Sequence, residues 1–256
     1  MAREGSAVGA MGRSPTAGAG CRPFMKRIGL IGGISPESTE IYARLFNKSA
    51  RARLGGEHSA NFIVWHCDYG RMIAIYHARD WAHYEAEIIE AGEGLKRAGA
   101  AALMIGSNTS HIAAEGLARA TGVPVVHVVD ALAGAMRSAG VERPLLLGTP
   151  VVMAEGSYYR RTLAAKFSGV AMAPDADEQR EVGRIILNEL CLGVVAEASR
   201  ARLLDIIAAH RDADGVILGC TELSMILKEG DCAPSVFDTT ALHAEAGMRF
   251  AFDEEP

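Results

Sequence analysis

Two short segments of the chain end in side chains that could do chemistry, and the segments resemble each other. One spans residues 103–109 and reads LMIGSNT, and the other spans residues 216–222 and reads VILGCTE. Each is an apolar run followed by a glycine and a small nucleophilic residue, Ser107 in the first and Cys220 in the second. Parallel α/β proteins place functional groups where a buried strand ends and a helix begins. The two segments therefore predict a site built from two similar halves.

Cys220 is a candidate for catalysis because of its position at the second of these turns. Free N–H groups and the helix dipole at a strand-to-helix turn lower the pKa of a thiol and raise the population of thiolate. A lone buried cysteine is more often structural, but the matching turn at Ser107 favours a catalytic role here. The sequence therefore predicts a reactive thiol at Cys220.

The first turn concentrates polar side chains. Residues 107–111 are Ser, Asn, Thr, Ser and His, and they directly follow an apolar strand. A helix N-cap would account for Ser107 or Asn108 alone but not for the whole group. Asn108 and Thr109 offer donors and acceptors for a carboxylate and an ammonium group, and His111 lies one helical turn from Ser107. We interpret the group as part of a functional site.

A glycine-rich turn near the start of the folded region predicts a further part of the site. Gly29-x-x-Gly32-Gly33 lacks the G-x-G-x-x-G spacing of dinucleotide-binding loops, so we expect it to let the backbone approach a small ligand. Ser35 and Pro36 then predict the N-cap and the first residue of a helix. The free N–H groups of residues 35–38 could hold a carboxylate.

Composition argues against several other classes of protein. The chain has 256 residues, 49% hydrophobic and 22% charged, as in an ordinary globular protein. A formal net charge of −5 gives no basic surface for nucleic acid, and no apolar run approaches the roughly 18 residues that span a membrane. The five cysteines are odd in number and form no C-x-x-C pair, which argues against disulfides and zinc and for a reducing compartment. We expect no metal site, and we expect Cys67, Cys191 and Cys232 to be ordinary core or surface residues.

Apolar periodicity and turn residues predict alternating strands and helices. Strands are expected at residues 26–33, 61–66, 101–106, 123–129, 144–148, 215–219 and 236–238. Helices are expected from residue 36 and at residues 81–98, 110–120, 153–167, 183–192, 198–210 and 240–250. This alternation is typical of an α/β fold with parallel sheets. Residues 1–24 lack any such pattern, and we expect a disordered N-terminal extension; a start at Met25 and a transit peptide are the alternatives.

The order of elements repeats along the chain. From Gly32 to Ser107 is 75 residues, and from Gly148 to Cys220 is 72 residues. Two similar spacings with similar ends predict two pseudosymmetric lobes, each a parallel sheet flanked by helices. The first lobe would comprise residues 25–129 and 240–256, and the second residues 130–239. The ligand site is expected between them, where the carboxyl ends of both sheets face each other.

With these motifs the chain resembles the cofactor-independent aspartate/glutamate racemase family, in particular its aspartate racemase branch. The resemblance extends from about residue 26 to residue 251. It rests on an ordered set of segments, at residues 28–39 (IGLIGGISPEST), 53–60 (RLGGEHSA), 107–111 (SNTSH), 185–193 (IILNELCLG), 215–222 (GVILGCTE) and 236–238 (VFD).

The resemblance implies a cytoplasmic homodimer that needs no cofactor and interconverts L- and D-amino acids, aspartate or glutamate first among them. One residue removes the α-proton and another returns a proton from the opposite face. Both are most often cysteines in this family; Cys220 matches the second, and Ser107 occupies the position of the first. The resemblance places Ile34, Ser35, Asn108, Thr109 and Thr221 in substrate binding, with His111 and Glu222 in support.

Two departures from the family pattern have chemical consequences. A serine hydroxyl is a far weaker acid than a thiol, whose ordinary pKa is about 8.5, so Ser107 is a poor base that can still donate a proton or relay one from water or His111. We therefore expect Cys220 to be the efficient base for one enantiomer. In addition, Arg180 is the only basic residue in residues 175–181, where acidic substrates would favour more, so a neutral or basic amino acid stays open. A solvated acidic loop unrelated to the substrate is the other interpretation of this stretch.

Other functions are compatible with a single thiol in such a crevice. Decarboxylation of a substituted malonate and cis–trans isomerisation use related carbanion or thiol-adduct chemistry. A protein that binds an amino acid without turning it over is the alternative from a different class.

Overall fold

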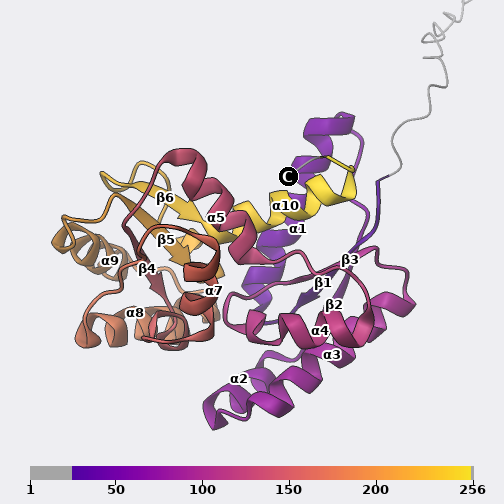
Figure 1. Cartoon of the computed structure of the whole chain (residues 1–256), viewed down its shortest axis with the longest axis horizontal. Helices are drawn as coiled ribbons and strands as arrows, with labels where there is room; N and C mark the ends of the chain where they lie inside the picture. The colour runs from indigo at the N-terminus through magenta and orange to yellow at the C-terminus, as the bar shows by residue number, and fades with distance from the viewer. Residues whose placement is uncertain (1–24, 255–256) are drawn as a thin grey trace, which may run out of the picture.

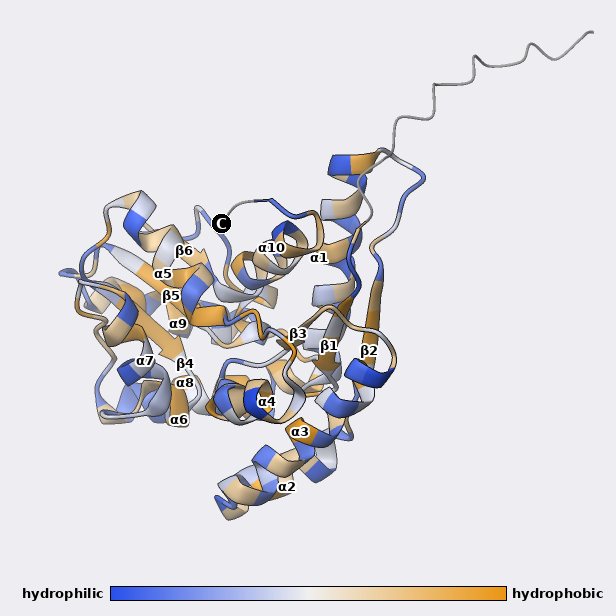
Figure 2. Ribbon diagram, turned by 45° about the vertical axis from the view of Figure 1, so that its right-hand side comes forward, coloured by the Kyte–Doolittle hydropathy of each residue, from blue (hydrophilic) through white to orange (hydrophobic). Residues whose placement is uncertain are grey.

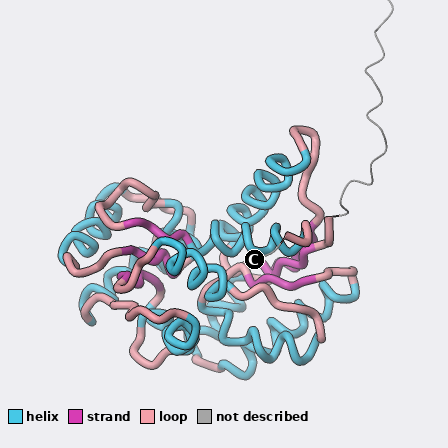
Figure 3. The backbone as a smooth tube through the Cα atoms, turned by 45° about the horizontal axis from the view of Figure 1, so that its top comes forward, coloured by secondary structure: helices cyan, strands magenta, loops and turns pink. Residues whose placement is uncertain are grey.

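Two lobes make up the computed structural model, which describes residues 25–254 (Figure 1). Each lobe is a three-stranded parallel sheet with helices packed around it, and Figure 3 shows the two groups of strands well separated. The fold class predicted from the sequence is confirmed, while the predicted N-terminal extension lies outside the described residues. No helix in residues 25–254 is long and apolar enough to cross a membrane.

The first sheet has the strand order β2-β1-β3, with Ile28 opposite both Phe62 and Ala102. Its strands are β1 (Ile28–Gly32), β2 (Phe62–His66) and β3 (Ala102–Ile105). The helices of this lobe are α1 (Pro36–Leu54), α2 (Tyr69–Ala78), α3 (Trp81–Arg97), η1 (Thr109–Ala113) and α4 (Ala114–Thr121).

The second sheet has the order β4-β5-β6, with β5 at its centre. Its strands are β4 (Pro144–Gly148), β5 (Gly215–Gly219) and β6 (Ser235–Asp238). The accompanying helices are α5 (Val128–Ala139), α6 (Pro150–Met153), α7 (Tyr158–Lys166), α8 (Ala176–Asn188), η2 (Leu190–Leu192), α9 (Glu197–Ala209) and η3 (Thr221–Met225).

The last helix, α10 (Thr239–Ala251), returns the chain to the first lobe. Its Ala244, Met248 and Ala251 are buried in one core with residues of β1 and β3. It also packs against α1 and α5, and Figure 1 shows it lying beside α1. The C-terminal helix therefore ties the second lobe to the core of the first.

The internal repeat is visible in the pairing of the strands. β1 pairs with β3 in one lobe, and β4 pairs with β5 in the other. β1, β3, β4 and β5 are buried along their whole length, as apolar strands covered on both faces by helices should be (Figure 2). An isolated bridge at Val125 adds a fourth strand position beside β3 in the first sheet, and one at Met172 adds a fourth strand position beside β4 in the second.

Capping residues account for most differences from the predicted elements. The strand expected at 123–129 shrinks to one bridge at Val125, because His127 caps α5 at Val128. The helix expected at 183–192 begins instead at Ala176, because Asp175 and Glu178 form a capping box. The helix expected at 153–167 begins instead at Tyr158 as α7, because Ser157 caps it, and the short α6 precedes it. α2 was not predicted.

The glycine-rich turn after β1 lies close to the backbone that follows β2. Gly33 has a φ of +77°, and a Cβ there would lie 2.1 Å from the carbonyl oxygen of Cys67. The Cys67 N–H donates to the Gly32 carbonyl at 2.9 Å. Gly33 therefore admits the neighbouring backbone after β2, and the approach of a small ligand at this turn stays a prediction.

Three histidines gather where the chain passes between the lobes. His111 lies in η1, His127 caps α5, and His243 lies on α10. The ring of His111 meets the other two edge-on, with centroids 4.7 Å from His127 and 5.2 Å from His243. Burial lowers the pKa of His111 to about 4, that of His127 to about 2 and that of His243 to about 3.

Hydrogen bonds hold these rings in their neutral form. His243 Nε2 donates to the Val126 carbonyl at 2.8 Å, so its Nδ1 accepts from the Tyr42 hydroxyl at 2.7 Å. His111 Nε2 and His127 Nδ1 accept from backbone N–H groups at 3.3 and 3.1 Å. Protonation would remove each acceptor, so the cluster favours neutral imidazoles.

Acid should destabilise the fold through these three histidines. The unfolded chain takes up a proton at each ring near pH 6.5, whereas the folded chain keeps the rings neutral to about pH 4 or below. Stability is therefore fully present above pH 6.5 and is lost as the pH falls towards 4. The slope is about 1.4 kcal/mol per pH unit for each ring. Urea denaturation between pH 7.5 and 4.5 measures it.

A glutamine at one of these positions separates titration from packing. His243→Gln keeps a donor and an acceptor but cannot titrate. The slope of stability against pH should therefore fall by about 1.4 kcal/mol per pH unit, which corresponds to one proton fewer per chain. His66→Gln, at an exposed site, is the matched control. An identical slope for His243→Gln and the unmodified protein would contradict the prediction.

Candidate active site

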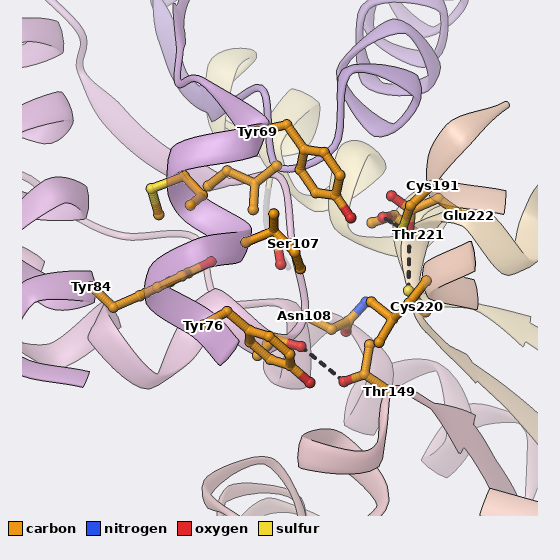
Figure 4. A pocket seen from close by; sticks show the side chains of 15 residues that line it. Tyr69, Tyr76, Tyr84, Ser107, Asn108, Thr149, Cys191, Cys220, Thr221 and Glu222 are labelled. Carbon is orange, nitrogen blue, oxygen red and sulfur yellow. Dashed lines mark hydrogen bonds between the residues drawn. The ribbon is translucent and has the colours of Figure 1, made fainter. Parts of the chain in front are cut away.

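A pocket lies between the lobes and is lined from both. Its empty space is about 480 Å3, counting its open mouth. The lining residues are Ile34, Tyr69, Met72, Ile73, Tyr76, Tyr84, Ser107, Asn108, Thr109, Thr149, Leu187, Cys191, Cys220, Thr221 and Glu222. Figure 4 shows Ser107 and Cys220 on different sides of this space. The crevice predicted from the two strand ends therefore contains both residues.

Cys220 lies directly after β5 and is 9% exposed. Its thiol donates to Glu222 Oε2 over 2.9 Å. Burial raises the pKa of the Cys220 thiol well above its usual value, and the Glu222 carboxylate raises it further. The expectation of a lowered pKa is wrong, because the turn enters the short helix η3 and the loss of hydration dominates.

Glu222 is the acceptor around which this side of the pocket is organised. The residue is 2% exposed, and its Oε1 accepts from the Ser35 hydroxyl at 2.6 Å. Its Oε2 accepts from the Thr221 hydroxyl at 2.8 Å as well as from Cys220. Glu222 therefore connects the N-cap of α1 in the first lobe to the thiol in the second.

Ser107 lies half-buried at the end of the first sheet. Its hydroxyl oxygen accepts a hydrogen bond from the Ser110 backbone N–H at 3.4 Å. His111 is fully buried and donates through Nδ1 to the Ser107 backbone carbonyl at 2.8 Å. The imidazole thus holds the turn in place through the backbone. The expected relay from His111 to the Ser107 hydroxyl is not supported by this contact.

Asn108 presents an unused acceptor in the pocket. Its Nδ2 donates to the Thr239 hydroxyl at 3.0 Å, and Thr239 in turn donates to the Leu218 carbonyl at 2.6 Å. The Asn108 Oδ1 is buried and has no hydrogen-bond partner. Because buried polar atoms are normally paired, this oxygen is a candidate contact for a ligand donor.

The other residues predicted to bind substrate divide into two groups. Ile34, Thr109 and Thr221 line the pocket. Thr109 shares a hydrogen bond of 3.1 Å with Thr149, across the two lobes. Ser35 is 1% exposed and is not among the residues that line the pocket. Its hydroxyl donates a hydrogen bond to Glu222.

Several residues that line the pocket are not predicted by the sequence analysis. Thr149 follows β4 at a third strand end, and the rule that found Ser107 could have found it. Tyr69 and Tyr76 come from the unpredicted α2, and Tyr84 hydrogen-bonds Ser110 at 2.8 Å. Cys191 lies beside the Tyr69 hydroxyl and Glu222, and burial raises the pKa of its thiol, so the expectation of an ordinary core residue was incomplete.

Comparison with known proteins shows which family and which fold the chain shares. The sequence model of the Asp/Glu/Hydantoin racemase family matches residues 31–247. A Yersinia pestis protein assigned to the Asp/Glu racemases is 37% identical, with a TM-score of 0.80 over 89% of this chain and 99% of that chain. An aspartate racemase homologue from Pyrococcus horikoshii is 31% identical, with a TM-score of 0.77 over the same shares. The aspartate racemase of Picrophilus torridus, 21% identical, shares the fold with a TM-score of 0.71 over 88% of this chain and 94% of that chain.

The titration of Cys220 should depend on Glu222. We expect the rate of Cys220 alkylation by iodoacetamide to rise only above pH 9, because burial and the neighbouring carboxylate both raise the pKa of the thiol. In Glu222→Gln the carboxylate charge is gone, so the pH midpoint should fall. Peptide mass spectrometry of the alkylated protein follows each cysteine separately.

The same experiment contains its control. Cys232 is half-buried, and its neighbouring acids are Glu229 and Asp231, so its midpoint should be the same in both proteins. A Cys220 midpoint at or below 8.5 in the unmodified protein would contradict the assignment.

Proposed function

Because the chain belongs to the Asp/Glu/Hydantoin racemase family, we propose that it is a racemase of α-amino acids that transfers protons at the two faces of the α-carbon. The observation that carries the proposal is the pair of strand ends that bring Ser107 and Cys220 to one pocket. Such a reaction needs an acid and a base on opposite sides of the substrate. The resemblance further predicts a cytoplasmic homodimer that uses no cofactor, and these points stay predictions.

The polar residues of the pocket suggest how the substrate is held. Asn108 Oδ1, which lacks a donor, would accept from the α-ammonium group. The Thr109 hydroxyl and the backbone N–H groups at the two turns would donate to the α-carboxylate. Thr221 would act mainly through its backbone, because its hydroxyl already donates to Glu222. These contacts would orient the Cα–H bond towards one of the two reactive side chains.

Cys220 would act as a base with the help of Glu222. The thiol proton first moves to Glu222 Oε2, 2.9 Å away, and the thiolate then removes the α-proton. The electron pair of the broken C–H bond passes into the substrate carboxylate as an enediolate. The Ser107 hydroxyl supplies a proton to the opposite face, its oxygen regains a proton from water, and Glu222 returns its proton to solvent.

The two directions of the reaction would differ in their rate-limiting steps. A raised thiol pKa keeps Cys220 protonated, so that it holds a proton to donate. Ser107 as a base must form an alkoxide, and each pKa unit costs about 1.4 kcal/mol. The equilibrium constant between enantiomers is nevertheless unity. The asymmetry therefore lies in the individual steps and not in the overall equilibrium.

The alternatives fit the pocket less well. Decarboxylation of a malonate would bring a second carboxylate and no ammonium group to Asn108 Oδ1 and Glu222, which are both acceptors. Decarboxylation is also distinguished by release of CO2, and isomerisation by a change at a double bond. A non-catalytic binding protein would show a thermal shift with an amino acid but no turnover.

Removing the thiol should abolish racemisation. We expect Cys220→Ala to lower the rate at which an L-amino acid yields the D form by at least about 100-fold, the usual contribution of a general acid or base. Chiral chromatography measures the product, and a thermal shift with the amino acid should persist because Cys220 is not needed for binding. Cys232→Ala is the control and should keep full activity. Full activity in Cys220→Ala would refute the mechanism.

Replacing the Ser107 hydroxyl by a thiol should accelerate proton removal on the face that Ser107 serves. Ser107→Cys supplies a group whose pKa is several units lower, so proton removal on that face should accelerate. Ser107→Ala should instead lose inversion while Cys220 continues to exchange the α-proton. A Ser107→Ala enzyme as fast as the unmodified enzyme would show that Ser107 takes no part.

A further inference from the structure

The part of the pocket that would receive the substrate side chain contains no cation. Its walls come from α2 on one side and from the end of α8 and η2 on the other. They are formed by Tyr69, Met72, Ile73, Tyr76, Leu187 and Cys191. Glu222 is the only residue with a charged side chain among the lining residues of the described chain (Figure 4).

The cations on and next to these two elements do not line the pocket. On α2, Arg71 forms an ion pair with Glu87 and does not line the pocket. On α8, Arg180 is an exposed residue paired with Asp177, three residues before it. Arg184, one turn further on, is also absent from the lining residues. Arg79, after α2, lines a neighbouring cavity and not this one, although its charge partly opposes the rise that burial causes in the pKa of Tyr76.

Arg184 is fixed by two carboxylates. Its guanidinium lies 2.9 Å from Glu181 and 2.6 Å from Glu189. A ligand carboxylate would have to break these ion pairs to recruit it. Arg184 is therefore no substitute for a cation in the pocket, and neither is the exposed Arg180, the basic residue of residues 175–181.

A second carboxylate would be unfavourable in this environment. It would lose hydration against tyrosine, methionine and isoleucine side chains without gaining an ion pair. It would also lie in the same pocket as the carboxylate of Glu222, which repels it. An amide or thioether side chain of the same size carries no such charge, and the hydroxyls of Tyr69 and Tyr76 could hydrogen-bond an amide.

We propose that the substrate is an α-amino acid with an uncharged side chain, and that Leu187 and Ile73 contribute to this specificity. The proposal rests on the racemase function proposed above. It departs from aspartate and glutamate, which the family resemblance placed first.

Isosteric substrates test the proposal without altering the protein. L-Glutamine and L-glutamate differ in the distal group but hardly in size, as do L-asparagine and L-aspartate. We expect kcat/KM for racemisation of each amide to exceed that of its acid by about tenfold or more, equivalent to about 1.4 kcal/mol. L-Methionine should resemble glutamine. Equal or higher kcat/KM for the acids would overturn the proposal.

A cation placed on the wall should reverse the preference. Leu187 is half-buried, so Leu187→Lys can keep its stem on the wall and bring an ammonium group to the pocket. The glutamine-to-glutamate ratio of kcat/KM should fall by about tenfold, whereas Leu187→Met should keep the ratio within about twofold. Ile73→Lys provides the same test from α2 if Leu187→Lys is unstable. An unchanged ratio in folded Lys variants of both positions would also count against the proposal.

The outcomes separate this proposal from the racemase assignment. If no amino acid, acidic or neutral, exchanges its α-proton or yields the D form, the racemase function itself fails. If acids are racemised faster than their amides, the function stands and the proposed side-chain class is wrong.

Discussion

The buried carboxylate of Glu222 is the contact on which both the architecture and the chemistry of the site depend. It accepts hydrogen bonds from Ser35 in the first lobe and from Cys220 and Thr221 in the second. A buried carboxylate is costly unless its oxygens are satisfied, so these three donors make its burial tolerable. The same bonds fix where the lobes meet and where the thiol proton can go. The contact between the lobes and the protonation state of Cys220 are thus linked through one side chain.

The two halves of the site share a backbone plan but differ in how they are held. The Cys220 thiol is hydrogen-bonded to a carboxylate, whereas the Ser107 hydroxyl is hydrogen-bonded only to a backbone N–H of its own turn. His111 holds that turn through a hydrogen bond to the Ser107 carbonyl. Asn108 and Thr109 form hydrogen bonds with residues of the second lobe, Asn108 with Thr239 and Thr109 with Thr149. The internal repeat therefore explains why both residues face one pocket. The differences between the halves explain why their chemistry should be unequal.

Local sequence patterns predict the framework well because they reflect local physics. The apolar runs of β1, β3, β4 and β5 and the small residues after them placed Ser107 and Cys220 correctly at strand ends. The pKa of Cys220 could not be predicted, because it depends on burial by residues distant in the chain. Tyr69, Tyr76 and Cys191 also escaped prediction, since no periodic pattern says which face of their elements meets the other lobe. For the same reason, the sequence does not reveal that the Ser35 hydroxyl donates to Glu222.

The central claim, that Cys220 and Ser107 serve opposite faces of the α-carbon with unequal efficiency, is tested most directly by hydrogen exchange. Each pure enantiomer of an accepted amino acid is incubated with the enzyme in D2O, and NMR compares the rate of deuterium entry at the α-carbon with the rate of inversion. The account predicts that one enantiomer, the one whose α-proton faces Cys220, exchanges markedly faster relative to inversion than the other. Equal ratios for both enantiomers would contradict it.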